Sequence, residues 1–142
     1  MSNLVVSNIS DGTTSVGTGY VVNGSAKAWC LLNQSATNDA FYDSYNFSSS
    51  TDDGTGQTTV TFTSSMANAN YATPSMTESG TGFNDIRSLN RDSSQTRGSS
   101  SYSFYNCHSG NYADNSQYIS VVFFGDLASR ISGNAYSKPI HA

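Results

Sequence analysis

The residues whose types and spacing most resemble a chemical site lie in the stretch SSTDDGTGQTTVTF, residues 49–62. Asp52 and Asp53 precede a Gly-Thr-Gly turn, a pattern compatible with a calcium loop, a phosphate-binding loop or a hairpin turn. A calcium loop needs about six oxygen ligands and commonly closes with an acidic residue, but only Thr and Gln side chains follow here. A phosphate loop leads into a helix, whereas Thr-Thr-Val-Thr-Phe is a strand pattern. We therefore expect a hairpin turn that binds at most a weak peripheral cation.

Other residues that could carry chemistry are few. The chain has two histidines, His108 and His141, and contains no nucleophile elbow, zincin motif or Walker loop. A serine nucleophile paired with His108 would need a third, orienting group that the sequence does not show. A carboxylate pair could cleave a glycan, and the candidates for it are Asp43, Asp52, Asp53, Glu78, Asp85 and Asp126. Because loop carboxylates rarely keep the fixed separation that such enzymes need, we predict no catalytic residue, no cofactor and no metal site.

Two cysteines and one histidine leave alternatives open. Cys30 and Cys107 are 77 residues apart, and each lies in an apolar or aromatic stretch. We expect small buried thiols rather than a disulfide, because synthesis in a cytoplasm disfavours oxidation. His108 is expected at the surface or at an interface, where three copies around an axis would also be able to hold a metal.

The elements that must position any site are expected to be β-strands. Only 11% of the 142 residues are charged, and Ser, Thr, Gly, Asn and Tyr are abundant, which favours short strands and turns over helices. We expect six to eight strands, no helix, and an all-β fold: an antiparallel β-sandwich or jelly roll with an extended N-terminal arm. Apolar or alternating runs predict strands at 26–34, 40–49, 59–63, 101–109 and 118–128.

The alternation of side chains also predicts which residues face the core. Phe41, Tyr45 and Phe47 are expected to share one face of a single strand. In the strand at 101–109, Tyr102 and Phe104 lie opposite Tyr105, and in the last strand Val121 and Phe123 lie opposite Val122 and Phe124. Trp29, the single tryptophan, is predicted to anchor the core beside the last strand, and the alternative is a sugar-stacking platform.

Composition divides the chain into three segments. Residues 1–25 are turn-rich and sparsely apolar, typical of an attachment arm; residues 26–127 form the sandwich; and residues 128–142 form an irregular tail. Within the sandwich, residues 78–100 have no sustained period and predict a long exposed loop. The role of the segment 73–100 stays open.

Charge and hydropathy exclude two classes of partner. The net charge of −4 argues against a nucleic-acid binder, which needs a basic face. No apolar run is long enough to insert into a membrane, and the N-terminus lacks the pattern of a signal peptide. We therefore expect synthesis in a cytoplasm.

A series of short motifs is spread over the first half of the chain. These motifs are Lys27-Ala28-Trp29, Asp43-Ser44-Tyr45-Asn46, Ser48-Ser49, Thr51-Asp52, Gly54-Thr55-Gly56, Thr59-Val60-Thr61-Phe62 and Ala69-Asn70-Tyr71. Together they resemble a module found in virion proteins of tailed phages. That module reads approximately K-A-W-V-N-F-N-G, then D-S-[FY]-N-V-S-S-[IV]-T-D-N-G-T-G-D-[YF]-T-V-[TN]-F, then A-N-Y, and its proteins often begin S-T-L-K-V-x-x-I-x-D. Cys30, Leu32 and Asp53 depart from the pattern, which has Val, Phe and Asn there.

The resemblance implies a structural, non-enzymatic virion protein, often homotrimeric, made in the cytoplasm of a bacterial host. We predict a head-decoration or head-fibre-like element that contacts other virion proteins through Leu4, Val5, Val6 and Ile9. Val122 and Phe124 are predicted to contact other copies of the chain, because a sandwich covers only one face of each sheet.

Two alternatives to this function remain. The chain could be the receptor-binding knob of a tail fibre, which would recognise a host surface glycan through Tyr102, Tyr105, Tyr112 and Tyr118. It could also be an enzyme that acts on surface polysaccharide, using the carboxylates named above.

Overall fold

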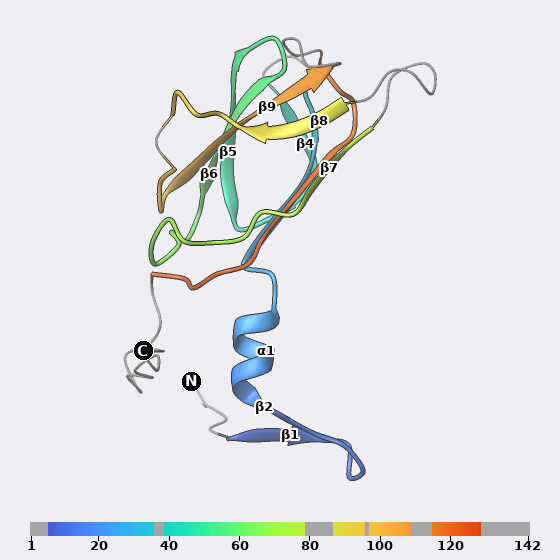
Figure 1. Ribbon diagram of the computed structural model, residues 1–142, viewed down its shortest axis with the longest axis vertical. Coiled ribbons are helices and arrows are strands. Elements are labelled where there is room, and N and C mark those ends of the chain that lie inside the picture. The colour runs from blue at the N-terminus through green and yellow to red at the C-terminus, as the bar shows by residue number, and fades with distance from the viewer. Residues whose placement is uncertain (1–5, 36–38, 79–86, 96, 109–114, 129–142) are drawn as a thin grey trace.

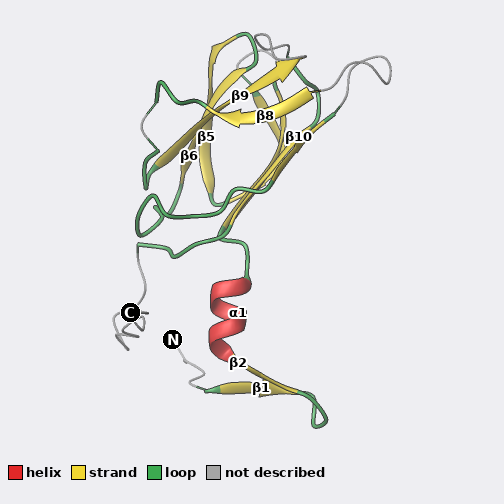
Figure 2. Cartoon of the chain, in the orientation of Figure 1, coloured by secondary structure: helices red, strands yellow, loops and turns green. Residues whose placement is uncertain are grey.

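The computed structural model describes residues 6–35, 39–78, 87–95, 97–108 and 115–128, and shows a β-sandwich with a small N-terminal extension (Figures 1 and 2). The described elements of the extension are β1 (Asn8–Ser10), β2 (Ser15–Gly17) and α1 (Thr18–Gly24). Those of the sandwich are β3 (Ala28–Asn33), β4 (Ala40–Tyr45), β5 (Phe47–Gly54), β6 (Gln57–Phe62), β7 (Ser75–Thr77), β8 (Arg87–Arg91), β9 (Ser101–His108) and β10 (Ile119–Phe123).

Two four-stranded antiparallel sheets form the sandwich. The first sheet has the order β4-β3-β10-β7, and the second sheet has the order β5-β6-β9-β8. The predicted all-β sandwich is therefore confirmed. The most apolar strand, β10, lies inside the first sheet between β3 and β7, where both of its edges are hydrogen-bonded.

The core lies between the two sheets and is centred on an aromatic cluster. The ring of Phe123 lies 5.1 to 5.6 Å, centroid to centroid, from four other rings. These four rings belong to Phe47, Phe62, Tyr71 and Tyr102. Fully burying one such side chain contributes about 1.5–3 kcal/mol, so this cluster supplies a large part of the sandwich's stability. The predicted alternation in β6, β9 and β10 is confirmed, since their core-facing residues are buried.

The stretch with the two carboxylates is the hairpin that joins β5 and β6, as predicted. Gly54 and Gly56 have φ values of 137° and 67°, which glycine adopts without strain. The Asp52 carboxylate accepts a hydrogen bond from the Gly54 amide at 2.9 Å, and the Asp53 carboxylate accepts one from Thr59 Oγ1 at 2.5 Å. Both carboxylates therefore stabilise the hairpin.

Three expectations about the elements are wrong. Residues 18–24 form a short helix, α1, where no helix was expected. Residues 40–49 are not one strand, because Asn46, with φ of 62°, transfers the chain from β4 in the first sheet to β5 in the second. Part of the predicted loop at 78–100 is strand β8, which pairs with β9.

Two aromatic residues expected in the core face outward instead. Tyr42 is an extra residue in β4 at a bulge, because Asp43 lies opposite Leu31 while Phe41 lies opposite Leu32. The bulge reverses the alternation, so that Phe41 packs on the core while Tyr45 is exposed. Trp29 lies beside the last strand as expected, but its side chain is on the outer side of the sheet and is 37% exposed.

Candidate functional site

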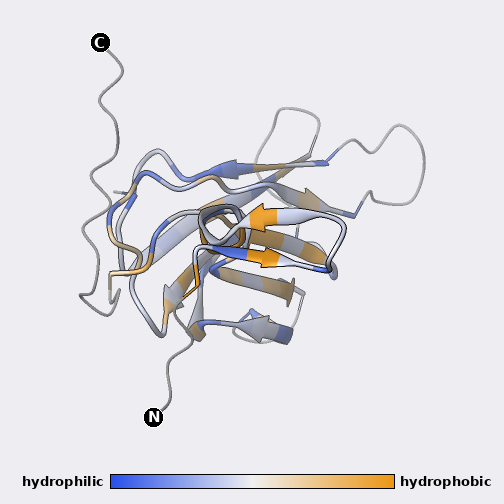
Figure 3. Cartoon of the chain, turned by 90° about the horizontal axis from the view of Figure 1, so that it is seen from below, coloured by the Kyte–Doolittle hydropathy of each residue, from blue (hydrophilic) through white to orange (hydrophobic). Residues whose placement is uncertain are grey.

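The N-terminal extension, which we call the foot (residues 6–25), projects away from the sandwich (Figure 1). No residue of α1 is buried. Strands of three residues and a helix of seven residues are marginally stable by themselves in water. Six apolar side chains of the foot are exposed: Val6, Ile9, Val16, Tyr20, Val21 and Val22. The foot therefore offers uncovered apolar side chains. Figure 3 views the molecule from the foot end and colours apolar segments of the chain orange.

The predicted attachment residues lie partly in this foot. Val6 and Ile9 are 41% and 50% exposed, so both are accessible to a partner. Leu4 and Val5 lie outside the described residues. Sequence reasoning did not assign Val16, Tyr20, Val21 and Val22 to the same surface, because it predicted neither β2 nor α1.

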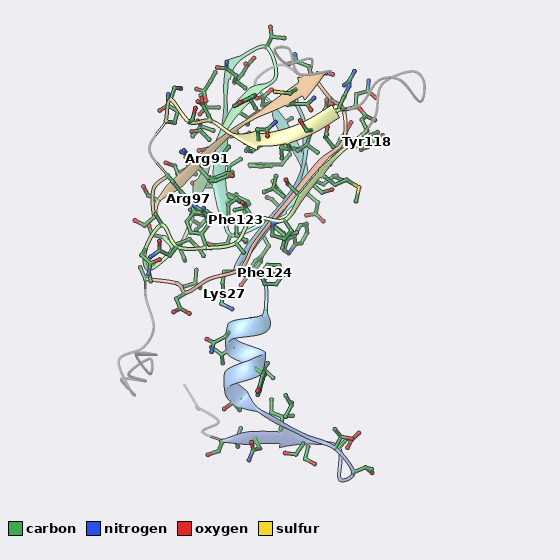
Figure 4. The ribbon with its side chains drawn as sticks, viewed as in Figure 1. Lys27, Arg91, Arg97, Tyr118, Phe123 and Phe124 are labelled. Atoms are coloured by element: carbon green, nitrogen blue, oxygen red, sulfur yellow. The ribbon has the colours of Figure 1, made fainter. Side chains whose placement is uncertain are left out.

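Lys27 joins the foot to the sandwich. Its ammonium group donates hydrogen bonds to the carbonyl of Val22 and to the carbonyl and hydroxyl of Ser25, the last two at 2.7 and 2.8 Å. These acceptors lie at the C-terminal end of α1, where the helix dipole favours a positive charge. The backbone of Lys27 is itself fixed, because its amide donates to the Phe123 carbonyl at 2.8 Å. Figure 4 shows Lys27 beside Phe124 at the junction. A single buried lysine thus orients α1 on the sandwich.

The second uncovered surface is the outer face of the first sheet, which points away from the second sheet. Strand alternation and register assign its residues. We define the outer face as Trp29, Leu31, Asn33, Tyr42, Asp43, Tyr45, Met76, Glu78, Tyr118, Ser120, Val122 and Phe124. Five of its large apolar side chains are more than one third exposed: Trp29, Tyr42, Tyr45, Met76 and Tyr118.

The outer face has two halves that differ in chemistry. Near the foot, Trp29 lies between Tyr45 on β4 and Val122 on β10, which are its register partners. Far from the foot, the rings of Tyr42 and Tyr118 stack at 5.2 Å. Figure 4 shows Tyr118 at the end of the sandwich away from the foot and Phe124 at the end close to it. We call these the proximal half (Trp29, Tyr45, Val122, Phe124) and the distal corner (Asn33, Tyr42, Glu78, Tyr118).

The predicted oligomer and glycan residues can now be placed. Val122 and Phe124 are half-buried and lie on the side opposite Val121 and Phe123, as predicted. Tyr118, a predicted glycan contact, is exposed on the same outer face as Val122 and Phe124, the predicted oligomer contacts. The sequence alone did not show that these residues share one surface.

The four predicted glycan residues do not form one site. Tyr102 is only 6% exposed and belongs to the aromatic core, so its assignment as a glycan contact is wrong. Tyr105 is half-buried on the second sheet, away from Tyr118 on the first. Tyr112 lies outside the described residues. Tyr42, the actual neighbour of Tyr118, was missed because the bulge in β4 is not visible in the sequence pattern.

A buried polar network closes the end of the sandwich near the β5–β6 hairpin. Asp39 is 2% exposed and accepts a hydrogen bond from Thr58 Oγ1 at 2.5 Å. Gln34 Nε2 donates to Thr58 Oγ1 and to the Gly56 carbonyl, both at 2.9 Å. Burial raises the pKa of Asp39 to about 6, against the hydrogen bond from Thr58. The network ties the hairpin to β3.

One cation packs on the aromatic core. The guanidinium of Arg97 lies 4.2 Å from the centroid of the Tyr71 ring, and Figure 4 shows Arg97 beside Arg91 near Phe123. The hydroxyl of Tyr71 donates to the Gly98 carbonyl at 2.8 Å, which fixes the ring. Arg97 therefore makes a cation–π interaction with Tyr71, a ring of the aromatic core.

Comparisons of the chain with models of protein families, with curated proteins and with solved structures found no match. The similarity to the phage module therefore depends on the matching residues in the sequence alone. Among the described residues, no helix is long and apolar enough to cross a membrane, and no three His, Cys, Asp or Glu residues are grouped as metal ligands would be.

Proposed function

We propose that the chain is a structural protein of a tailed-phage virion, a homotrimeric head-decoration or head-fibre-like element that its foot fixes to other virion proteins. The observation that carries this proposal is the foot, which exposes six apolar side chains and lies apart from the sandwich. A segment of this kind is stabilised when a partner covers it. The resemblance of residues 27–71 to the phage module supports the proposal that this partner is another virion protein.

The charge distribution of the foot suits contact with protein. Asp11 is the only charged residue between residues 6 and 25. Its carboxylate accepts hydrogen bonds from the amides of Thr13 and Thr14 at 2.9 and 2.7 Å, at the turn between β1 and β2. The apolar side chains can therefore be buried without desolvating an unpaired charge.

The proximal half of the outer face supports self-association. Trp29, Tyr45 and Val122 form a continuous row across three strands. Lys27, which joins the foot to the sandwich, lies two residues before Trp29. Aromatic and aliphatic side chains of this kind are enriched at protein interfaces. A trimer would cover this row and leave the foot directed toward the particle.

Attachment is tested with phage particles assembled without this protein and then mixed with the purified chain. Wild-type protein is expected to co-sediment with the particles, whereas the double variant Val6→Asp and Ile9→Asp is expected to stay in solution. The charged side chains oppose burial of the foot, but they do not touch the sandwich core.

The control is Met76→Asp, which places a carboxylate on an exposed apolar residue of the sandwich, and it should still co-sediment. Equal co-sedimentation of the foot variant and wild type would show that the foot does not attach the protein. Locating the wild-type chain in particles by antibody labelling then distinguishes a head element from a tail-fibre knob.

A further inference from the structure

The distal corner combines exposed aromatic rings with fixed polar atoms. Tyr42 and Tyr118 are 50% and 51% exposed, and their stacked rings are inclined by only 17°. Asn33 Nδ2 donates a hydrogen bond to the hydroxyl of Tyr42 at 3.1 Å. Because each ring limits the rotation of the other, both hydroxyls are held in place at the surface.

Glu78 adds a fixed carboxylate beside the rings. Its Oε1 accepts hydrogen bonds from the amides of Gln117 and Tyr118 at 2.5 and 3.3 Å. Both of these bonds go to Oε1, and none of the described residues donates to Oε2. The pKa of Tyr42 is raised, mainly by desolvation, then by its neighbour Tyr118 and by the charge of Glu78.

This set of groups matches the chemistry of a pyranose sugar. The C–H groups on one side of a pyranose ring form an apolar surface that packs on an aromatic ring, while its hydroxyls donate to a carboxylate and exchange hydrogen bonds with a carboxamide or phenol. Tyrosine is suited to such surfaces, because it provides area and a hydroxyl at a low cost in conformational entropy.

Charge narrows the class of sugar. Asp43 and Glu78 are the charged residues of the outer face, and both are acidic. A sulfated, phosphorylated or uronic-acid sugar would be repelled there. A second copy of the chain is also disfavoured at this corner, because it would have to desolvate the carboxylates.

We propose that the distal corner binds an uncharged pyranose glycan, with the Tyr42–Tyr118 pair as the stacking surface and Glu78 and Asn33 as hydrogen-bonding groups. The site is separate from the foot and from the proximal half, so the protein could bind glycan while it is attached and assembled. Binding by the purified protein does not require particles, so this proposal and the proposed attachment can fail independently.

The test is affinity electrophoresis of the full-length protein in native gels that contain dextran, mannan or galactan, with dextran sulfate as the anionic counterpart of dextran. At least one of the three neutral polysaccharides is expected to retard the wild-type protein, and dextran sulfate is not. Tyr118→Ala removes half of the stacked pair and should weaken the apparent affinity about tenfold. The matched control is Tyr20→Ala, which removes an exposed tyrosine of the foot and should be retarded like wild type.

A second variant tests whether weaker binding results from the lost contact and not from unfolding. Glu78→Gln keeps the size of the side chain but removes the charge, and it should also weaken the retardation while thermal unfolding and circular dichroism stay close to wild type. The proposal is overturned if none of the neutral polysaccharides retards the wild type, if only dextran sulfate does, or if folded Glu78→Gln and Tyr118→Ala proteins are both retarded as strongly as wild type.

Discussion

Asp39 shows how a single residue connects backbone conformation, burial and titration. Its φ of 50° is in the left-handed region, which Asp and Asn tolerate better than most residues. The turn that this conformation makes brings a carboxylate into a buried site, where its hydrogen bond from Thr58 is short. Nearby Asp52 and Asp53 raise the pKa further, after the larger effect of burial. In the folded protein the protonated form of Asp39 therefore predominates up to about pH 6, about two pH units higher than in the unfolded chain.

The stability of the protein should depend on this group between about pH 4 and pH 6. The unfolded chain loses the Asp39 proton near the ordinary pKa of about 4, whereas the folded protein keeps it until about 6. Within this window the folded state binds more protons, so the contribution of Asp39 to stability is fully present below pH 4 and is lost as the pH rises through 6. The difference in the free energy of unfolding is about 3 kcal/mol.

Urea unfolding at a series of pH values checks this expectation when wild type is compared with Asp39→Asn. Asn tolerates the same φ and can accept the hydrogen bond from Thr58, but it does not titrate. The stability of wild type relative to the variant should fall between pH 4 and pH 6 and be constant above pH 7. A constant difference over the whole range would contradict the buried, protonated carboxyl.

At the scale of elements, the sequence predicted the regular strands well and the irregular ones poorly. β6, β9 and β10 each bury one side, so their alternation is visible in residues such as Val60 and Phe123. The bulge at Tyr42 depends on the pairing of β4 with β3, which a local pattern does not contain. The sequence therefore identified only part of the outer face. It predicted surface contacts for Val122 and Tyr118, but not for Tyr42 and Tyr45.

The helix α1 was missed for a different reason. Its sequence, Thr18–Gly24, contains two glycines, adjacent valines and Asn, all of which have low helix propensity. Hydrogen bonds from Lys27 to its C-terminal end stabilise it instead. Lys27 lies outside α1, so the sequence pattern within the helix does not reveal these hydrogen bonds.

Replacing Lys27 with Met should release α1 from the sandwich. Met fills a similar volume but donates no hydrogen bond, so the carbonyls of Val22 and Ser25 lose their shared partner. Hydrogen bonds to a charged group contribute about 1.5–3 kcal/mol, so amide hydrogen exchange in α1 should become at least about tenfold faster. Exchange in β10 should change much less, because its hydrogen bonds with β3 remain.

Arg91→Met is the control, because it also replaces a cation by Met, but on strand β8 of the second sheet. It should leave exchange in α1 as in wild type. If Lys27→Met also left exchange unchanged, the orientation of the foot would have to come from other contacts.

At the scale of the whole molecule, the uncovered surfaces are arranged in sequence along its length. The foot lies at one end, the proximal half of the outer face follows it, and the distal corner lies at the far end (Figures 1 and 4). A trimer formed through the proximal half would place three feet near one another and three distal corners away from them. Attachment, assembly and glycan binding would then use different parts of one small chain.

Light scattering coupled to size-exclusion chromatography tests this division of the surface. Wild type should elute with three times the chain mass of 15.1 kDa. Val122→Lys places a charge in the proximal row next to Trp29, and it should shift the protein to the monomer, because burying an unpaired ammonium opposes association. Tyr118→Ala removes a larger side chain from the same strand face but at the distal corner, so it should remain trimeric. A monomeric wild type would contradict assembly through this face. If Tyr118→Ala were also monomeric, the interface would extend over the distal corner and would cover the proposed glycan site.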